Sequence, residues 1–398
     1  MNIDDDFTKA AARRRGRNTR RVRNIGVAAC VSLLAAMAVR STPATAASAR
    51  TWSVQPSPSP SGRDGYLYAV ACPSSMRCVA VGYSNDANFG YRLLEVWNGS
   101  TWTTVTTPGP AHYTTFSGVT CVGPNFCTAV GAGPNGPLVD HWNGSQWSTQ
   151  TAPGKPLYAF QSISCPSTTE CFAVGSTDDE QHALAERWDG HTWSALSTPA
   201  TTEFGDSLRS VSCVSTTYCI AVGETEVSDV GDATQLIEQW NGTKWSGLTA
   251  AVLARDTVLD GISCTSATNC FATGYSFDGV GSAPNSRRHL EHWDGHSWSI
   301  VVTPGPAGTR TAFLGITCSN PTNCIAVGSS NDDPMHSLNP KPLIDAWNGH
   351  SWVMQTAAPS PTGIGELDGI GCAATACVAV GSAFAPTARQ ERTLIERS

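Results

Sequence analysis

The sequence has little charge and no recognised catalytic motif. Only 14% of its 398 residues are charged, and Lys plus Arg (25) are fewer than Asp plus Glu (32). Nucleic acids and anionic membrane surfaces bind basic proteins, so both are excluded as partners. The G-x-S-x-G, H-E-x-x-H and Gly-rich phosphate-loop patterns are missing. The sequence therefore identifies no catalytic residue, no cofactor site and no metal ligand.

Long hydrophobic runs are also missing, apart from one near the start. The apolar stretch Ile25–Val39 has 15 residues, too few for a comfortable transmembrane helix. A basic segment precedes it, and two A-x-A patterns follow at Ala44–Ala46 and Ala47–Ala49. Residues 1–49 are therefore predicted to be an export signal, with an uncleaved anchor as the alternative. We expect a secreted, extracellular, monomeric protein without a membrane span after cleavage; which A-x-A site is cut stays open.

Removal of residues 1–49 leaves a mature chain, 50–398, with a strongly acidic balance. It has 16 basic and 29 acidic residues, a net charge of −13. This balance favours neutral or cationic partners.

The cysteines, by contrast, are numerous and regularly spaced. There are 15, and all but Cys30 fall into pairs that recur every 44 to 54 residues. The pairs are Cys72/Cys78, Cys121/Cys127, Cys165/Cys171, Cys213/Cys219, Cys264/Cys270, Cys318/Cys324 and Cys372/Cys377. The spacing differs from that of structural zinc sites, and disulfides are usual in exported proteins. We predict seven disulfides, each within one repeat.

Each repeat has the pattern of four β-strands. In the first repeat the expected strands are Leu67–Cys72, Cys78–Gly82, Arg92–Trp97 and Thr101–Thr106. Asn98-Gly99 predicts a two-residue hairpin turn between the last two strands. Four antiparallel strands in about 50 residues are typical of a propeller blade. The sequence predicts an all-β fold, a seven-bladed β-propeller of four-stranded antiparallel blades; an open solenoid is the alternative.

The two ends of the mature chain complement each other. The last repeat stops at Leu394–Ser398, where its third strand should end. The segment Thr51–Val54 matches the fourth strand of the other repeats. We therefore predict that the N-terminal strand completes the last blade and closes the ring.

An acidic residue and two tryptophans recur in the second half of the repeats. The acidic residues are Glu95, Asp140, Glu186, Glu238, Glu291, Asp345 and Glu396. Alternation along the strands places Glu95, Trp97 and Trp102 on one face, with Trp102 opposite Glu95. Because nearly every blade carries the Trp pair, we interpret it as packing between blades rather than a sugar-stacking platform. We expect the carboxylates to accept hydrogen bonds from Trp N–H or backbone groups.

The hairpin motif carries a family resemblance. Trp188-Asp189-Gly190-His191-Thr192-Trp193 approaches the Asp-box pattern but lacks its leading Ser and one spacer residue. The chain resembles secreted bacterial β-propeller repeat proteins, broadly of the kelch and Asp-box type, across residues 51–398. The kelch double glycine and the WD40 Gly-His are missing. The resemblance implies the propeller fold and transfers no active site.

Function is expected on one face of the propeller. The connections from strand two to three and from strand four to the next blade carry the length variation, and they share a face. Tyr113, Phe116, Tyr158 and Phe160 lie in this region and are our candidate ligand-binding residues. Short acidic runs there, such as Asp178-Asp179-Glu180, are interpreted as solvated turns, with Ca²⁺ binding as the alternative.

Two classes of function remain. The first is an extracellular binding or interaction module for a glycan, a cell-wall polymer or a protein. The alternative is a secreted polysaccharide-active hydrolase or lyase with its site on the variable loops. The missing catalytic motifs favour binding, and convergence of carboxylates or His at the axial mouth would favour the enzyme.

Overall fold

The computed structural model describes residues 50–177, 182–199, 205–226, 233–251, 257–278, 285–305, 310–331, 339–374, 376–385 and 390–398. The 28 strands form seven four-stranded antiparallel sheets, which confirms the predicted fold class. Within the described part of the chain, no helix has the length and apolarity needed to cross a bilayer. The predicted export signal lies outside the described residues and stays a prediction.

Each blade has an inner, a second, a third and an outer strand. The inner strands are β2 (Asp64–Ser74), β6 (Thr115–Cys121), β10 (Ala159–Ser167), β14 (Gly205–Ser215), β18 (Thr257–Ser266), β22 (Arg310–Asn320) and β26 (Glu366–Ala373). The second strands are β3 (Arg77–Asn85), β7 (Cys127–Gly133), β11 (Glu170–Ser176), β15 (Tyr218–Glu226), β19 (Asn269–Asp278), β23 (Asn323–Asn331) and β27 (Ala376–Ala385). The third strands are β4 (Gly90–Trp97), β8 (Gly136–Trp142), β12 (Ala183–Trp188), β16 (Ala233–Trp240), β20 (Asn285–Trp293), β24 (Lys341–Trp347) and β28 (Gln390–Arg397). The outer strands are β5 (Trp102–Thr104), β9 (Trp147–Gln150), β13 (Trp193–Leu196), β17 (Trp245–Gly247), β21 (Trp298–Ile300), β25 (Trp352–Gln355) and β1 (Ser53–Val54).

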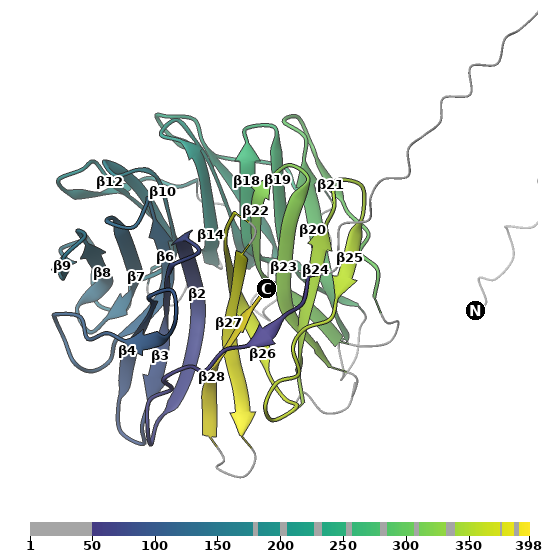
Figure 1. Ribbon diagram of the computed structural model, residues 1–398. Coiled ribbons are helices and arrows are strands. Elements are labelled where there is room, and N and C mark those ends of the chain that lie inside the picture. Colours follow the sequence, from purple (N-terminus) through teal and green to yellow (C-terminus); the bar gives the residue numbers. More distant parts are fainter. Residues whose placement is uncertain are drawn as a thin grey trace, which may run out of the picture. The chain divides into compact units, whose positions relative to one another are not determined.

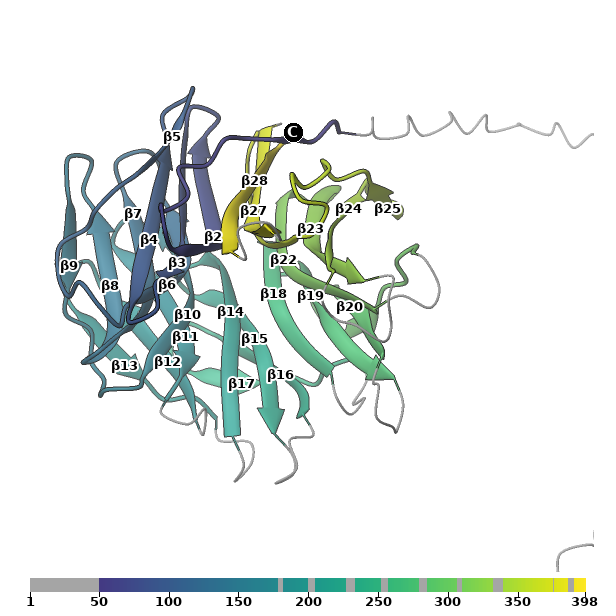
Figure 2. The same ribbon diagram turned by 90° about the horizontal axis from the view of Figure 1, so that it is seen from below.

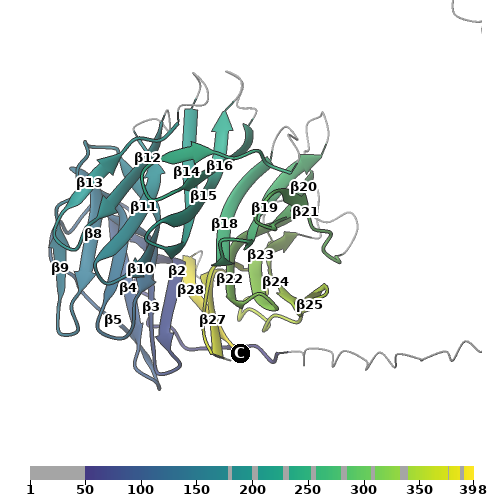
Figure 3. The ribbon, with the colours of Figure 1, turned by 90° about the horizontal axis from the view of Figure 1, so that it is seen from above.

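The inner strands surround the propeller axis (Figures 1 and 2). Each contacts the inner strands of both neighbouring blades, and β2 contacts β26 across the closure. Figure 3 shows the ring from the opposite side. Serine hydroxyls fasten several of these contacts: Cys213 N donates to Ser164 Oγ (3.0 Å) and Cys264 N to Ser212 Oγ (2.9 Å). We number the blades 1 to 7 from β2, so that β26–β28 with β1 form blade 7.

The N-terminal strand completes blade 7. Ser53 pairs with Arg397 and Val54 with Glu396, and Gln55 N donates to the carbonyl oxygen of Ile395 at 2.8 Å. In Figure 1 the purple β1 accordingly lies beside the yellow β28. The ring is thus closed by pairing the first strand with the last, as predicted.

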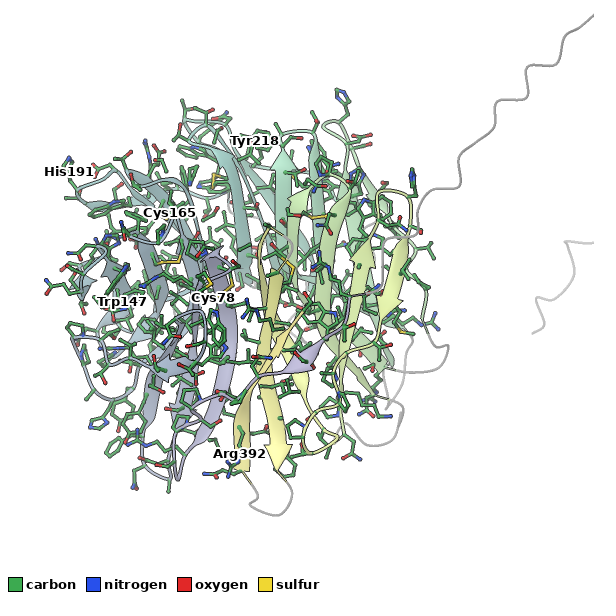
Figure 4. The ribbon with its side chains drawn as sticks, viewed as in Figure 1. Cys78, Trp147, Cys165, His191, Tyr218 and Arg392 are labelled. Atoms are coloured by element: carbon green, nitrogen blue, oxygen red, sulfur yellow. A yellow bond between two sulfur atoms is a disulfide. The ribbon has the colours of Figure 1, made fainter. Side chains whose placement is uncertain are left out.

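All seven predicted disulfides are present within their own repeats. They are Cys72–Cys78, Cys121–Cys127, Cys165–Cys171, Cys213–Cys219, Cys264–Cys270, Cys318–Cys324 and Cys372–Cys377. Each joins an inner strand to its second strand; Cys213 and Cys219, for example, are register partners in the β14–β15 hairpin. Figure 4 labels two of the bonded residues, Cys78 and Cys165. The disulfides secure the hairpins on one face of the propeller, which we call the turn face because the Trp hairpins turn there too.

The two cysteines of each pair differ in their exposure to solvent. The first cysteine, near the end of the inner strand, is half-buried in every blade. The second cysteine is 0–2% exposed and belongs to the core between blades; these residues are Cys78, Cys127, Cys171, Cys219, Cys270, Cys324 and Cys377. The second cysteines are therefore closed to solvent and serve the core between blades.

The turn between the third and outer strands differs from the prediction. Trp97 pairs directly with Trp102, so the loop has four residues, Asn98–Thr101, instead of two. The Asn98 side chain explains the longer loop, since its Oδ1 accepts hydrogen bonds from the backbone N of Ser100 and Thr101, both at 2.9 Å. Gly99 has a φ of +97°, which favours glycine at this position. The predicted two-residue turn, with Trp102 opposite Glu95, is therefore wrong.

The hydrophobic core lies between the blades. Seven clusters of buried residues occupy the seven interfaces. Trp97 and Trp102, for example, pack against Val378, Val380 and Ile395 of blade 7. This confirms that the paired tryptophans pack between blades.

Candidate binding site: the axial cavity and the variable-loop face

The four candidate aromatic residues separate into buried and accessible pairs. Phe116 and Phe160 are 0% exposed and belong to the core clusters between blades 1 and 2 and between blades 2 and 3. They offer no ring surface to a ligand, which corrects the prediction for these two residues. Tyr113 is 65% exposed, and Tyr158 is partly buried beside the second cluster. A ligand role for these two tyrosines stays a prediction.

Tyr113 belongs to an aromatic cluster that sequence analysis had not assembled. Its ring makes an edge contact with Phe89 (5.6 Å between centroids), which packs on His112 (4.5 Å). The guanidinium of Arg63 lies 3.7 Å from the centroid of the Tyr91 ring. This cluster lies on the face opposite the turn face, which we call the variable-loop face.

A pocket of about 350 Å³ opens beside this cluster, between blades 1 and 2. Its lining includes Arg63, Tyr91 and Arg92. Arg92 is held by Thr107 Oγ1 (2.7 Å) and by the Pro110 carbonyl oxygen (2.9 Å), so its donors are used internally. Arg92 therefore has few hydrogen-bond donors left for a ligand in this pocket.

The second cavity, of about 200 Å³, lies on the propeller axis and is lined by all seven inner strands. Each strand contributes three consecutive residues, beginning at one position that differs from repeat to repeat. The residues at this position are Tyr68, Ser117, Gln161, Arg209, Asp260, Leu314 and Asp368. We call them the axial residues.

The axial residues are re-aimed by a β-bulge. In every inner strand the pairing skips this one residue, as between Leu208 and Ser210 in β14. Bulges redirect a side chain and are frequent next to functional sites. The residues on either side of the bulge are nearly invariant: Leu or Phe precedes, and a small residue followed by Val or Ile comes after.

The charged axial residues form a network. Arg209 Nη1 lies 3.0 Å from Asp260 Oδ1 in the next blade, and Arg209 Nε lies 3.0 Å from Glu224 Oε1. Burial lowers the pKa of Arg209, but Asp260 and Glu224 more than offset this, so that its pKa is raised. Burial raises the pKa of Asp260 to about 6, although Arg209 opposes the shift.

A second acidic group faces this network from blade 7. Burial raises the pKa of Asp368 well above its usual value, and Glu366 and Asp260 raise it further. Tyr68 shares the cavity, and its pKa is raised by burial and by Asp368. The ring of Tyr66 stacks on that of Tyr68 with centroids 6.5 Å apart. The axial cavity thus combines an excess of carboxyl groups with the ring of one tyrosine, Tyr68.

The repeated acidic residues, by contrast, are structural. All seven are buried, at 0–1% exposure, in the third strands. Several accept hydrogen bonds from the segment that follows the outer strand of the preceding blade: Ser57 Oγ donates to Glu95 (3.0 Å) and Ala358 N to Glu396 (2.9 Å). These contacts fasten one blade to the next, and the bond from Ala358 N is of the backbone kind that was predicted.

The tryptophan half of that prediction is wrong. Where the first indole of a hairpin donates, the acceptor is a backbone carbonyl in the disulfide loop of the same blade. Trp240 Nε1, for example, donates to the Thr216 carbonyl oxygen at 3.2 Å. These hydrogen bonds therefore hold each Trp hairpin to the disulfide loop of its own blade on the turn face.

Metal binding finds little support in the described residues. They contain no group of three or more His, Cys, Asp or Glu side chains arranged to hold a metal ion. Asp86 instead accepts hydrogen bonds from Asn88 N and Phe89 N, both at 2.9 Å, which agrees with a turn. Asn85-Asp86 was one of three acidic runs that we considered for Ca²⁺; of the other two, Asp178–Glu180 falls outside the described residues, and so does Asn331–Asp333 except for Asn331.

The sequence contained a signal for the axial site. When the seven repeats are aligned on their cysteines, the axial position is the one variable residue within a nearly uniform segment. That pattern marks a position serving something other than the common blade. The bulge itself depends on the pairing of two strands and leaves no comparable mark in one strand's sequence.

Comparison with known proteins supports the fold. No protein-family model matches the chain, and no curated protein matches it. Among solved structures, one described as "YCF48 bound to D1 peptide" has a TM-score of 0.55 at 14% identity, covering 87% of this chain and 96% of the other. "Structure of U3-55K" has a TM-score of 0.56 at 11% identity, covering 86% and 98%. "Crystal structure of RRP9 WD40 repeats" gives 0.56 at 10% identity, covering 87% and 96%. These similarities support the β-propeller fold and show nothing beyond it.

Proposed function

We propose that the protein is a secreted extracellular binding module whose ligand is held at the axial cavity from the variable-loop face. One observation carries this proposal. The seven inner strands are nearly uniform around the bulge, yet the seven side chains that the bulge turns into the cavity are of six different types. A position with a purely structural role should repeat as the adjacent residues do, whereas a binding site for one asymmetric ligand needs different groups around the ring.

The remaining features support export and a protein ligand. Seven disulfides are typical of an oxidising compartment, and the first 49 residues have the pattern of an export signal. We place the protein among secreted bacterial propellers of the kelch and Asp-box type, acting as a monomer. A protein segment is favoured over a glycan because two of the four candidate aromatic rings are buried. One similar structure is described as peptide-bound, which is the same kind of partner.

The carboxyl groups at the axis favour a second candidate, a polysaccharide hydrolase. Burial raises the pKa of both Asp260 and Asp368, and glycosidases use a pair of carboxyl groups of which one has a raised pKa. The cavity volume of about 200 Å³ argues against this, because pockets for larger ligands measure roughly 300–1,000 Å³. Release of soluble sugars from cell-wall polymers would identify the enzyme.

The test is binding to a glycan array, cell-wall fractions and a peptide array. Gln161→Ala and Leu314→Ala change uncharged axial residues, and Ser100→Ala with Thr243→Ala serves as the control on the turn face. We expect the axial variants to lose binding at least tenfold and the control to bind like the wild type. Loss of binding only in the turn-face variant would contradict the proposal.

A further inference from the structure

The axial cavity has room for one side chain rather than for a bulky ligand. Its volume of about 200 Å³ is below that of pockets that enclose drug-sized molecules, roughly 300–1,000 Å³. Small side chains in the inner strands let the blades approach closely here. A Cβ on Gly369 would lie 2.6 Å from the carbonyl oxygen of Tyr68, and one on Gly315 equally close to that of Asp368. A narrow ligand that enters along the axis fits this space.

The charges in the cavity are unbalanced. Arg209 is the one cationic axial residue, and its donors already contact Glu224 and Asp260 Oδ1. Asp260 Oδ2 has no hydrogen-bond partner among the described residues, although the Asp260 side chain is only 10% exposed. A buried acceptor without a hydrogen bond lowers the stability of the protein unless a ligand supplies the donor.

The Asp368 carboxyl group also lacks a hydrogen-bond donor. It lines the cavity beside Tyr68, and no described residue donates a hydrogen bond to it or forms an ion pair with it. Its charged neighbours are acidic, since Glu366 and Asp260 both disfavour its ionised form. The cavity therefore offers two acceptors, Asp260 Oδ2 and the Asp368 carboxyl group, while its one axial cation, Arg209, is already bound to Glu224 and Asp260 Oδ1.

The aromatic wall suits an organic cation. Tyr68 lines the cavity and its ring stacks on that of Tyr66 with centroids 6.5 Å apart; a cation over the face of such a ring is attracted to it. A calcium ion needs six to eight oxygen ligands, and the described residues contain no cluster arranged to hold a metal. The acidic chain as a whole, with a formal net charge of −7, attracts a cationic partner toward the site.

We propose that the axial cavity receives a single protonated amine or guanidinium on a slender chain, held by Asp260 Oδ2 and the Asp368 carboxylate against the ring of Tyr68. This inference deepens the proposed function and rests on it. The cation is supplied either by a small amine or by a Lys or Arg side chain of a peptide. Both sources share the chemistry that the cavity recognises.

The experiment measures binding to the wild-type protein by calorimetry with matched probes. The small-amine arm uses n-butylamine and Nα-acetyl-lysine amide. The peptide arm compares peptides with a central Lys or Arg against the same peptide with norleucine, which keeps the chain and removes the charge. We expect the Lys and Arg peptides to bind at least tenfold more tightly than the norleucine peptide. Retained affinity in the small-amine arm identifies a free amine as sufficient.

Two variants locate the binding. Asp368→Asn keeps the shape and removes an acceptor charge, and it should weaken binding of the Lys peptide at least tenfold. Asp294→Asn is the control: it makes the same change in a turn-face loop where the first repeat already has an asparagine, Asn98. It should change the affinity less than twofold. Melting curves confirm that both variants are folded.

Three results would overturn the proposal. They are equal binding of the Lys and norleucine peptides, unchanged affinity in Asp368→Asn, and displacement of the Lys peptide by millimolar Ca²⁺ with stoichiometric Ca²⁺ binding. Because the peptide comparison uses the wild-type protein, it decides the question even if Asp368→Asn does not fold. Failure of every cationic probe, while Gln161→Ala still abolishes binding of a neutral ligand, would reject this inference and leave the proposed function standing.

Discussion

Gly223 of β15 lies directly against the carbonyl oxygen of Ser207 in β14, so close that a Cβ on Gly223 would be 1.9 Å from that oxygen. The approach occurs beside the bulge, where Gly223 pairs with Leu208. The glycine of the repeated Cys-x-Ala-Val-Gly motif is equally close to the inner strand in every blade. A Cβ added to it would lie 1.9–2.1 Å from a carbonyl oxygen of that strand. The repeated glycine and the axial bulge therefore occur side by side in every blade.

Gly223→Ala should destabilise the protein strongly. The new methyl group meets backbone that cannot move without shifting the inner strand, and overpacking typically costs about 1–3 kcal/mol or more. Gly247→Ala is the matched control in the same blade, because nothing lies within 4 Å of its Cβ position. Thermal unfolding should show a large loss for the first variant and almost none for the second. Equal melting temperatures would refute the close contact.

Ring closure predicts that Trp52, which directly precedes the closing strand β1, contributes strongly to the stability of the protein. It is 6% exposed and packs with Ile325 and Val327 of blade 6. Trp52→Ala should cost about 3–5 kcal/mol, as for other buried aromatics. Val302→Ala, at an 88% exposed position, should change stability by less than about 0.5 kcal/mol. Similar unfolding midpoints in urea for the two variants would argue against closure.

Stability should fall as the pH rises from about 5 to 8. Burial raises the pKa of Glu186 and of Glu238 to about 8, from a usual value of 4.5. Such a group binds a proton on folding between these two values, so the unfolding free energy decreases with rising pH across this window and levels off above it. Melting temperatures measured at pH 5 and pH 8 check the direction.

The double variant Glu186→Gln/Glu238→Gln should flatten this dependence by stabilising the protein more at pH 8 than at pH 5, by on the order of 1 kcal/mol or more. Asp189→Asn, at an exposed turn whose hydrogen bonds lower the pKa of Asp189, is the control and should leave the slope intact. An unchanged slope in the double variant would show that these two carboxyl groups do not titrate as described.

Replacing Arg209 should destabilise the protein more than replacing a comparably exposed arginine outside the axial cavity. Arg209→Met leaves two carboxyl groups, Asp260 and Glu224, without their cation, at a cost of about 1.5–3 kcal/mol. The loss should be larger at pH 8 than at pH 5, because removal of Arg209 raises the pKa of Asp260 further above 6. Arg187, equally exposed but paired with Glu170 alone, is the control. A larger loss in Arg187→Met would contradict the network.

Much of the architecture could be predicted from sequence because it is repeated. The spacing of Cys213 and Cys219 recurs in nearly every repeat and predicts both the hairpin and its disulfide. The match of Thr51–Val54 to the missing outer strand predicts closure. These features depend on local spacing, which a single sequence contains.

The predictions failed at features that are determined by contacts between strands. The Asn98-Gly99 pair indicates a turn, but only the pairing of Trp97 with Trp102 sets its length. Phe116 sits at a loop boundary in sequence, yet it is drawn into the interface between blades 1 and 2. The axial residues occupy one variable position in the aligned repeats, but only the bulge turns their side chains toward one another. Register and burial of this kind are properties of neighbouring strands, so one strand's sequence does not determine them.

A crystal structure of the protein with Nα-acetyl-lysine amide would test the central claim most directly. We predict that the ammonium group lies in the axial cavity, about 2.7–2.9 Å from Asp260 Oδ2 and from a carboxylate oxygen of Asp368, with its chain against Tyr68. An amine located on the Trp hairpins of the turn face, or an axial cavity that stays without the amine while the ligand binds elsewhere, would contradict the account.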